Sequence, residues 1–157
     1  WMVNVHASGG RKMMQAAAER FAQRKSPPLL IGVTILTSLG ETDTAEIGYA
    51  GSPEDNVLRL AALAEESGLD GVVCSPREVK ALRVARGSEF ALVTPGVRPT
   101  GAALDDQKRV MTPGDAIRAG ASYLVVGRPI TAAEDPCASL AAINAEIASA
   151  LESAAGH

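Results

Sequence analysis

The sequence has little of what marks several classes of protein. It contains two cysteines, Cys74 and Cys137, which give neither a disulfide framework nor a zinc-binding spacing. No apolar run approaches the ~20 residues of a membrane span, and no signal peptide is visible. The formal net charge is −3, so neither a nucleic acid nor an anionic membrane is an expected partner. We therefore expect a cytoplasmic protein in a reducing setting.

What is present is an ordinary globular composition with a repeated pattern. The 157 residues are 46% hydrophobic and 21% charged, enough for one domain with a real core. Short apolar runs bounded by turn residues predict strands, and they alternate with Ala-rich segments at helical spacing. The expected strands are 1–7, 29–36, 70–75, 90–93 and 123–126. The expected helices are 11–25, 52–68, 75–87, 112–120 and a last one from 135 that frays after 151, with 40–51 as a loop.

This alternation predicts a parallel sheet, which leaves two architectures open. One is a doubly wound open sheet, and the other is a (β/α)8 TIM barrel, which normally needs ~250 residues. The chain opens at Trp1 inside an apolar run, and natural domains seldom begin in a buried strand. We therefore expect residues 1–157 to be one domain, the C-terminal portion of a TIM barrel with roughly strands 4–8. The earlier β/α units would belong to a longer chain.

A parallel barrel carries its site at the carboxyl ends of its strands. The polar residues there are His6, Ser8, Thr37, Ser38, Ser75, residues 94–98, Gly127 and Arg128. The set holds no lysine and no carboxylate directly at a strand end. It is therefore poorly equipped for acid–base chemistry and well equipped to hold a phosphorylated polar ligand.

Two of these residues have a simple structural interpretation beside a functional one. His6 is either a general base or, more simply, a packed histidine bonded to a neighbouring backbone group. Cys74 is most simply a small core residue. No Ser–His–Asp grouping can be argued from the spacing.

Two segments point to one phosphate site. In Tyr123-Leu-Val-Val-Gly-Arg-Pro129 an apolar strand runs into a glycine that permits a turn and an arginine at the mouth of the sheet. The alternative is an ordinary strand exit with a solvated arginine. Residues 94–111 form the longest segment without a periodic pattern, which is typical of a lid. Phosphate sites in TIM barrels use the loops after strands 7 and 8, the places these two segments would occupy.

Five motifs carry a family resemblance. They are Val3-Asn-Val-His-Ala-Ser-Gly-Gly10, Val33-Thr-Ile-Leu-Thr-Ser38, Leu69-Asp-Gly-Val-Val-Cys-Ser75, Leu92-Val-Thr-Pro-Gly-Val-Arg-Pro99 and Val125-Val-Gly-Arg-Pro-Ile130, with Asp106-Gln107 and Met111-Thr-Pro113 between the last two. With them the chain resembles the bacterial type of orotidine 5′-phosphate decarboxylase. The resemblance implies a TIM barrel that forms a homodimer with its active sites near the subunit interface. It also implies conversion of orotidine monophosphate to uridine monophosphate and CO₂, the last step of de novo UMP biosynthesis, without a cofactor or metal.

The resemblance assigns roles to five substrate-binding residues. Thr37 would contact the pyrimidine ring, Arg98 and Gln107 would serve closure and phosphate contact, and Gly127 with Arg128 would anchor the phosphate.

The family's catalytic cluster is absent from these residues. Its Asp-x-Lys-x-x-Asp motif has no counterpart, because the only Asp-x-Lys is Asp106-Gln-Lys108 and Met111 stands in place of the second Asp. The chain thus matches the binding half of the site, and we expect the catalytic Lys and Asp residues before Trp1.

Two other functions stay open. One is another phosphate-binding barrel enzyme, such as a sugar-phosphate epimerase or aldolase. The other is a non-catalytic half-barrel that binds a nucleotide phosphate or assembles with another chain.

Overall fold

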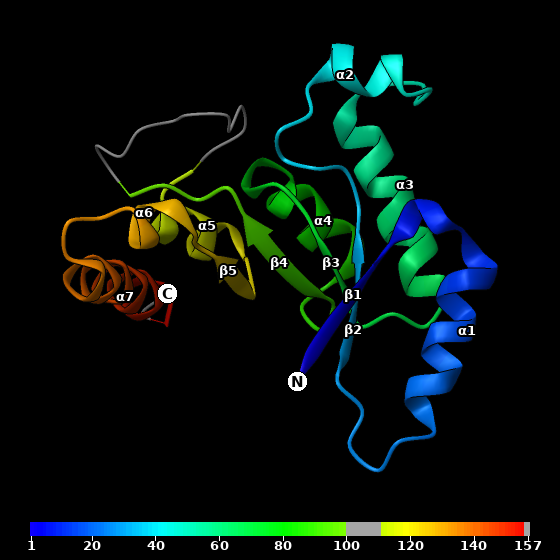
Figure 1. Ribbon diagram of the computed structural model, residues 1–157, viewed down its shortest axis with the longest axis horizontal. Coiled ribbons are helices and arrows are strands. Elements are labelled where there is room, and N and C mark those ends of the chain that lie inside the picture. Colours follow the sequence, from blue (N-terminus) through cyan, green and yellow to red (C-terminus); the bar gives the residue numbers. More distant parts are fainter. Residues whose placement is uncertain (100–110, 156–157) are drawn as a thin grey trace.

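The computed structural model describes residues 1–99 and 111–155, and these form a five-stranded sheet (Figure 1). The strands are β1 (Met2–His6), β2 (Leu29–Val33), β3 (Gly71–Val73), β4 (Ala91–Pro95) and β5 (Tyr123–Val125). Their order in the sheet is β1-β2-β3-β4-β5, and each strand pairs in parallel with the next.

This strand order decides between the two predicted architectures. A doubly wound sheet reverses its order at a switch point, because its second half is wound in the opposite direction. Here every described strand lies beside its neighbour in the sequence, which is the order of a TIM barrel. The described strands are therefore consecutive members of a barrel, and the doubly wound alternative is wrong.

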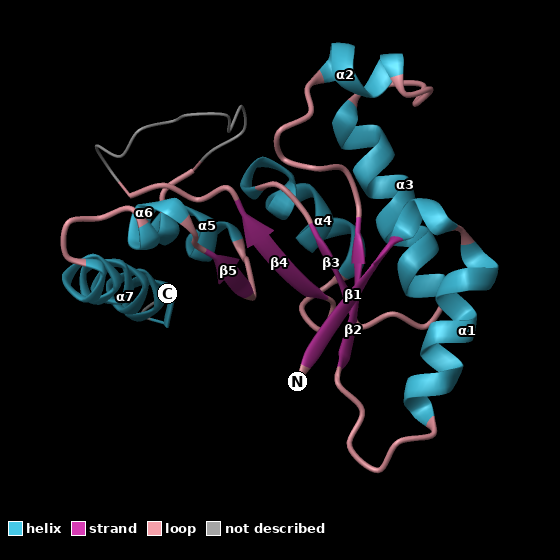
Figure 2. Ribbon diagram, viewed as in Figure 1, coloured by secondary structure: helices cyan, strands magenta, loops and turns pink. Residues whose placement is uncertain are grey.

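Helices connect and flank the strands (Figure 2). They are α1 (Arg11–Ala22), α2 (Glu41–Glu46), α3 (Pro53–Glu66), α4 (Val79–Arg86), α5 (Pro113–Ala119), α6 (Arg128–Thr131) and α7 (Pro136–Ala155), with 3-10 turns at Ala7–Gly9 and Pro76–Glu78. Helix α3 begins where the sequence predicts, since Ser52 Oγ accepts a hydrogen bond from the Asp55 N–H at 3.1 Å. Thr112 caps α5 in the same way, at 3.2 Å from the Asp115 nitrogen.

The hydrophobic core lies between the sheet and these helices. On α3 the apolar residues that recur at helical spacing are buried, with Val57, Ala61 and Ala64 at 0% exposure. The core also takes Val72 and Leu92 from β3 and β4, residues that the sheet register pairs side by side. Cys74 belongs to this core, so its prediction as a small packed residue is confirmed.

Some elements differ from the sequence-based expectation because local hydrogen bonds end or begin them. β2 stops at Val33 rather than at residue 36, and the Thr34 hydroxyl and N–H both donate to the Val73 carbonyl, at 2.7 and 3.3 Å. The expected loop 40–51 contains helix α2, which Asp43 caps by accepting from the Gly40 N–H at 2.7 Å. β4 continues to Pro95, so the expected lid begins two residues later than predicted.

Leu140, Ile143, Ile147 and Leu151 recur at helical spacing and predict a buried stripe on α7, which the structure bears out only in part. Ile143 is buried, but Leu140 and Leu151 are 44% and 54% exposed. Ala150 is buried instead, and Glu146 accepts from the Gly114 N–H at 2.7 Å. The inner face of α7 therefore combines Ile143 and Ala150 with the hydrogen bond that Glu146 accepts from α5, and the helix extends to Ala155 instead of fraying after residue 151.

Candidate functional site

The carboxyl ends of the strands meet at one edge of the sheet. The register places His6 beside Val33, Val33 beside Val73, and Pro95 beside Val125. The segments that follow the strands therefore share this edge, as the barrel topology predicts. They are residues 7–10, 34–40, 74–78, 96–99 and 126–131.

Thr37 lies in a tight turn of the segment that follows β2. The Leu39 N–H donates to the Leu36 carbonyl at 3.0 Å, which closes the turn around Thr37. Thr37 is 8% exposed, whereas its neighbour Leu36 is 49% exposed. The threonine is thus held in place by the protein at the edge where the barrel topology puts a ligand.

Arg98 is buried at the end of β4. It is 8% exposed, and its Nη1 donates to the Val97 carbonyl at 2.8 Å. Its backbone N–H donates to the Met111 carbonyl at 3.0 Å, and Val97 and Met111 form a bridge that joins the two ends of the intervening segment. Gly96, with a φ of 77°, makes the turn that leads into this position.

The charge of Arg98 has no acidic counterpart among the residues that the structure describes. A buried guanidinium is costly unless it is paired with an anion. Its single recorded side-chain partner in the described part of the chain is a neutral carbonyl. A guanidinium held at this edge of the sheet is a group that can bind an anion.

Gly127 and Arg128 follow β5 at the same edge. The Gly127 carbonyl accepts from the N–H groups of Ile130 and Thr131, at 2.9 and 3.1 Å, and thereby starts helix α6. A Cβ at Gly127 would meet no atom of the described residues within 4 Å, so they leave the space in front of this backbone open. Arg128 is exposed, which fits both a phosphate anchor and the solvated arginine of the alternative interpretation. The sequence-based expectations missed α6, although Gly127 followed by Pro129 at the second helical position was a usable signal.

Three other expectations at this edge have different outcomes. Gln107, with most of the expected lid, lies outside the described residues. His6 is exposed, so its interpretation as a packed histidine is wrong. Thr94 is fully buried, and its Oγ1 has no hydrogen-bond partner in the part of the chain that the structure describes.

Two carboxyl groups with lowered pKa lie in helix caps rather than among the predicted site residues. The Ser52 hydroxyl, followed by the Ser52 backbone, lowers the pKa of Asp55 at the start of α3. Hydrogen bonds from Arg118 and then Thr112 lower the pKa of Asp115 at the start of α5. Over residues 1–99 and 111–155 there is no group of three His, Cys, Asp or Glu side chains that would hold a metal ion. No described helix is long and apolar enough to cross a bilayer.

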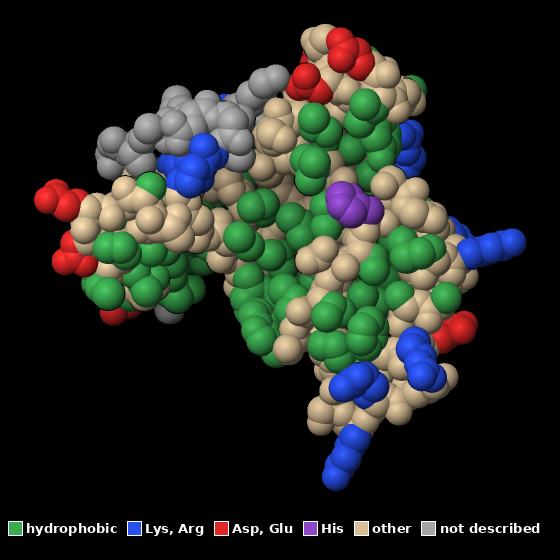
Figure 3. Space-filling model, viewed as in Figure 1, with side chains coloured by type: hydrophobic (Ala, Val, Ile, Leu, Met, Phe, Trp, Pro, Cys, Tyr) green, Lys and Arg blue, Asp and Glu red, His purple; other side chains and the backbone are tan. Residues whose placement is uncertain are grey.

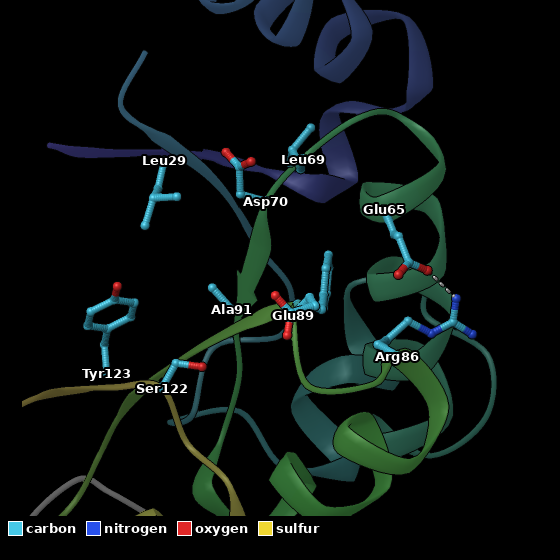
Figure 4. A pocket seen from close by; sticks show the side chains of 10 residues that line it. Leu29, Glu65, Leu69, Asp70, Arg86, Glu89, Ala91, Ser122 and Tyr123 are labelled. Atoms are coloured by element: carbon cyan, nitrogen blue, oxygen red, sulfur yellow. Dashed lines mark hydrogen bonds and ion pairs between the residues drawn. The ribbon is translucent and has the colours of Figure 1, made fainter. Parts of the chain in front are cut away.

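A hollow of about 470 Å³ lies at the opposite end of the strands (Figure 4). Leu29, Ala91 and Tyr123 line it, and these are the first residues of β2, β4 and β5. On one side of the hollow Arg86 pairs with Glu65 at 2.8 Å. Because parallel barrels carry their chemistry at the carboxyl ends, this hollow is separate from the candidate site.

Comparison with known proteins identifies relatives along nearly the whole chain. The family model for "Orotidine 5'-phosphate decarboxylase / HUMPS family" matches residues 1–143. The orotidine 5′-phosphate decarboxylase of Hydrogenovibrio crunogenus is 63% identical over 147 residues, which cover 94% of this chain and 62% of the relative. That of Nitrosococcus oceani is 59% identical over 147 residues, covering 94% of this chain and 63% of the relative.

Solved structures support the same assignment. The orotidine 5′-phosphate decarboxylase from Lactobacillus acidophilus superposes with a TM-score of 0.77 at 40% identity, over 93% of this chain and 62% of that chain. The enzyme from Sulfolobus solfataricus, at 18% identity and a TM-score of 0.62, covers 62% of that chain and supports the fold alone. The chain spans about three-fifths of the relatives it matches and is a partial TIM barrel. It belongs to the orotidine 5′-phosphate decarboxylase / HUMPS family.

Proposed function

We propose that this chain forms the pyrimidine- and phosphate-binding part of an orotidine 5′-phosphate decarboxylase, which converts orotidine monophosphate to uridine monophosphate and CO₂. One observation carries the proposal. The buried guanidinium of Arg98 lies at the same sheet edge as Gly127 and Arg128, so two cationic side chains share this edge. A nucleotide phosphate is an anion that both can bind.

Each proposed contact suits the chemistry of its residue. The Thr37 hydroxyl can donate to or accept from a polar base edge. The guanidinium of Arg128 suits bidentate contact with a phosphate, and the open space at Gly127 lets the ligand approach the backbone. We assign Gln107 to the same ligand through the family resemblance.

Groups that bind the substrate do not by themselves remove CO₂ from it. Loss of CO₂ leaves a carbanion, which needs a positioned acid and stabilisation of the developing charge. Among the described residues, the segments that follow the strands hold no lysine, and their one carboxylate, Glu78, accepts from the Ser75 N–H at 2.9 Å in a helix cap. We therefore place the catalytic groups outside residues 1–157, and this chain contributes the binding energy that holds the substrate against them.

The resemblance supports the remaining features of this proposal. They are a single domain over residues 1–157, a homodimer with active sites near the subunit interface, a cytoplasmic location, and a reaction without metal or cofactor.

A chimera tests the proposal in a complete barrel. The 147-residue span of the Hydrogenovibrio crunogenus enzyme that matches this chain is replaced by the corresponding residues of this chain. We expect the chimera to release CO₂ from orotidine monophosphate, because the binding groups are supplied in their own structural context. A folded chimera without turnover would contradict the proposal.

Arg128→Ala in the chimera tests the phosphate anchor. Loss of a charged bidentate contact should raise KM for orotidine monophosphate and lower kcat/KM by roughly 2–4 kcal/mol of transition-state binding. Orotidine, which lacks the phosphate, should react equally well with and without the substitution. Arg24→Ala, at an exposed arginine after α1, is the matched control. An unchanged kcat/KM for the nucleotide would remove Arg128 from the site.

A further inference from the structure

Helix α7 turns a partly polar face toward the rest of the protein. Ile143 and Ala150 are buried on this face, and Ser139 and Glu146 are half-buried at the same helical spacing. Figure 1 shows α7 alongside α5 and α6, and residues of α7 contact both of them. These two short helices adjoin the segments that carry Arg98 and Arg128. The two polar residues of α7 therefore lie where this helix meets the proposed phosphate site.

Ser139 contacts the segment that carries Arg128. Its hydroxyl donates to the carbonyl of Pro129, the residue after Arg128, at 2.7 Å. In a longer α-helix the Ala133 N–H would bond this carbonyl, but it donates to the Ile130 carbonyl at 3.2 Å. Ser139 thus satisfies a carbonyl at the end of α6 and ties the turn of Arg128 to α7. Figure 3 shows basic side chains above α6, on the side that faces away from α7.

Glu146 contacts the segment that leads back to Arg98. Its carboxylate accepts from the Gly114 N–H, in the first turn of α5, at 2.7 Å. A Cβ at Gly114 would come within 3.0 Å of Glu146 Oε1, so the glycine permits this close approach. Shortly before Gly114, the Met111 carbonyl accepts from the Arg98 N–H at 3.0 Å. Glu146 therefore fixes the start of α5, and the start of α5 fixes the backbone of Arg98.

One rigid element thus holds both arginine segments. α7 has 20 residues, and Asp135 Oδ1 accepts from the Ala138 N–H at 3.0 Å where the helix begins. Two guanidinium groups on different loops bind one phosphate tightly only when their loops are already aligned, because ordering them on binding lowers the affinity. A helix that contacts both loops supplies this alignment before the ligand arrives.

We propose that Ser139 and Glu146 are positioning residues for a phosphate ligand. Through them α7 holds the backbones of Arg128 and Arg98 so that both guanidinium groups converge on one phosphate, and neither residue touches the ligand. The inference rests on the proposed function for the identity of the ligand, a nucleotide monophosphate. Loss of either contact loosens one arginine and leaves the contact of Thr37 with the pyrimidine unchanged.

The experiment measures ligand binding to the chimera described above. Uridine monophosphate and uridine are titrated by calorimetry or NMR, and uridine, which lacks the phosphate, reports on the rest of the site. We expect Ser139→Ala and Glu146→Ala each to raise the dissociation constant of uridine monophosphate about three- to tenfold, and that of uridine less than about twofold. Ser149→Ala and Glu152→Ala, at exposed positions of the same helix, are the matched controls and should change neither.

A conservative variant separates positioning from general stability. Glu146→Gln keeps an oxygen that accepts from the Gly114 N–H, so it should bind uridine monophosphate within about twofold of the parent. Ser139→Ala removes a single oxygen and decides the proposal by itself where Glu146→Ala does not fold. Equal losses for uridine monophosphate and uridine would overturn the proposal, because they would show a merely structural role. Dissociation constants of uridine monophosphate that match those of the controls would overturn it too.

CO₂ release from orotidine monophosphate separates this inference from the proposed function. An active chimera whose variants lose affinity for the phosphate ligand alone supports both. An inactive chimera with the same selective loss supports the positioning residues and contradicts the proposed function. An active chimera without a selective loss overturns the positioning residues alone, and an inactive chimera without one overturns both.

Discussion

Thr94 carries a buried polar group that no hydrogen bond within the described residues compensates. It is fully buried at the end of β4, and Oγ1 has no hydrogen-bond partner within the described residues. A buried hydroxyl without a partner costs about 1–3 kcal/mol. Thr94→Val removes the hydroxyl and keeps the shape, so we expect the chimera to become more stable in urea unfolding by up to about 1 kcal/mol. A loss of stability would show that the hydroxyl has a partner in the complete barrel.

Residue identities at the site could be read from the sequence, but their environments could not. Gly127 and Arg128 follow an apolar strand, so their place at a strand exit was predictable. The burial of Arg98 was not, because it depends on the bridge between Val97 and Met111, fourteen residues apart. The exposure of His6 was missed for a related reason, since it depends on what packs against the face of β1 and not on the local sequence.

Helix α3 depends on its cap at Ser52. The serine hydroxyl accepts from the Asp55 N–H and donates to Asp55 Oδ2 at 2.7 Å. Ser52→Ala should destabilise the chimera by about 1 kcal/mol at neutral pH. It should also raise the pKa of Asp55 toward its usual value, because the Ser52 hydroxyl is the largest cause of the lowered pKa. Carboxyl titration by NMR and urea unfolding measure the two effects, with Ser26→Ala in an exposed loop as control.

The direction in which pH changes the stabilising effect of this cap follows from the lowered pKa of Asp55. A carboxyl whose folded-state pKa lies below its unfolded value stabilises the fold above the unfolded pKa of about 3.9, and this contribution is lost as the pH falls through the folded-state pKa. The stability difference between Ser52→Ala and the parent should therefore shrink in acid. A difference that grows below pH 4 would contradict this account of the cap.

A second prediction about the elements concerns Arg83, whose side chain joins two turns at the amino ends of β4 and β5. Its acceptors, at 2.6–3.2 Å, are the carbonyl oxygens of Gly87, Ser88, Phe90 and Gly120 and the hydroxyl of Ser122. Arg83→Met keeps most of the aliphatic stem and removes every one of these bonds. We expect a loss of about 2–3 kcal/mol in urea unfolding of the chimera, because charged hydrogen bonds to several carbonyls are lost together. Arg24→Met, at an exposed arginine, should be neutral, and equal values for both variants would remove Arg83 from this role.

The elements show where sequence patterns are informative. Helix starts were predictable, since Ser52-Pro53 and Thr112-Pro113 carry both a cap and a first-turn proline. Strand ends were not, because the end of β2 depends on its pairing with β3, which lies about forty residues away in the sequence. The buried face of α7 was predicted only in part, because Ile143 is buried as expected but Ala150 is buried where the apolar pattern favours Leu151.

At the scale of the molecule, the sequence predicted five β/α units and the structure supplied their order. Alternating strands and helices fit both a doubly wound sheet and a barrel. The two differ in the pairing of strands distant in the sequence, and no local pattern encodes that pairing. The family motifs did distinguish them, because they resemble those of a TIM barrel.

β1 and β5 are the outer strands of the described sheet, which leads to the last prediction, that the 157-residue chain made alone neither folds stably as a monomer nor releases CO₂ from orotidine monophosphate. Trp1 and Val125 are 80% and 51% exposed beside these outer strands, a surface that favours aggregation. The absence of turnover would have a separate cause, because the residues that we propose bind the substrate include no acid placed to protonate the carbanion. Purified chain of confirmed mass is tested by a thermal melt, light scattering and CO₂ release. A cooperative melt from a monomer would contradict the argument from the outer strands, and genuine turnover would contradict the placement of the catalytic groups outside residues 1–157.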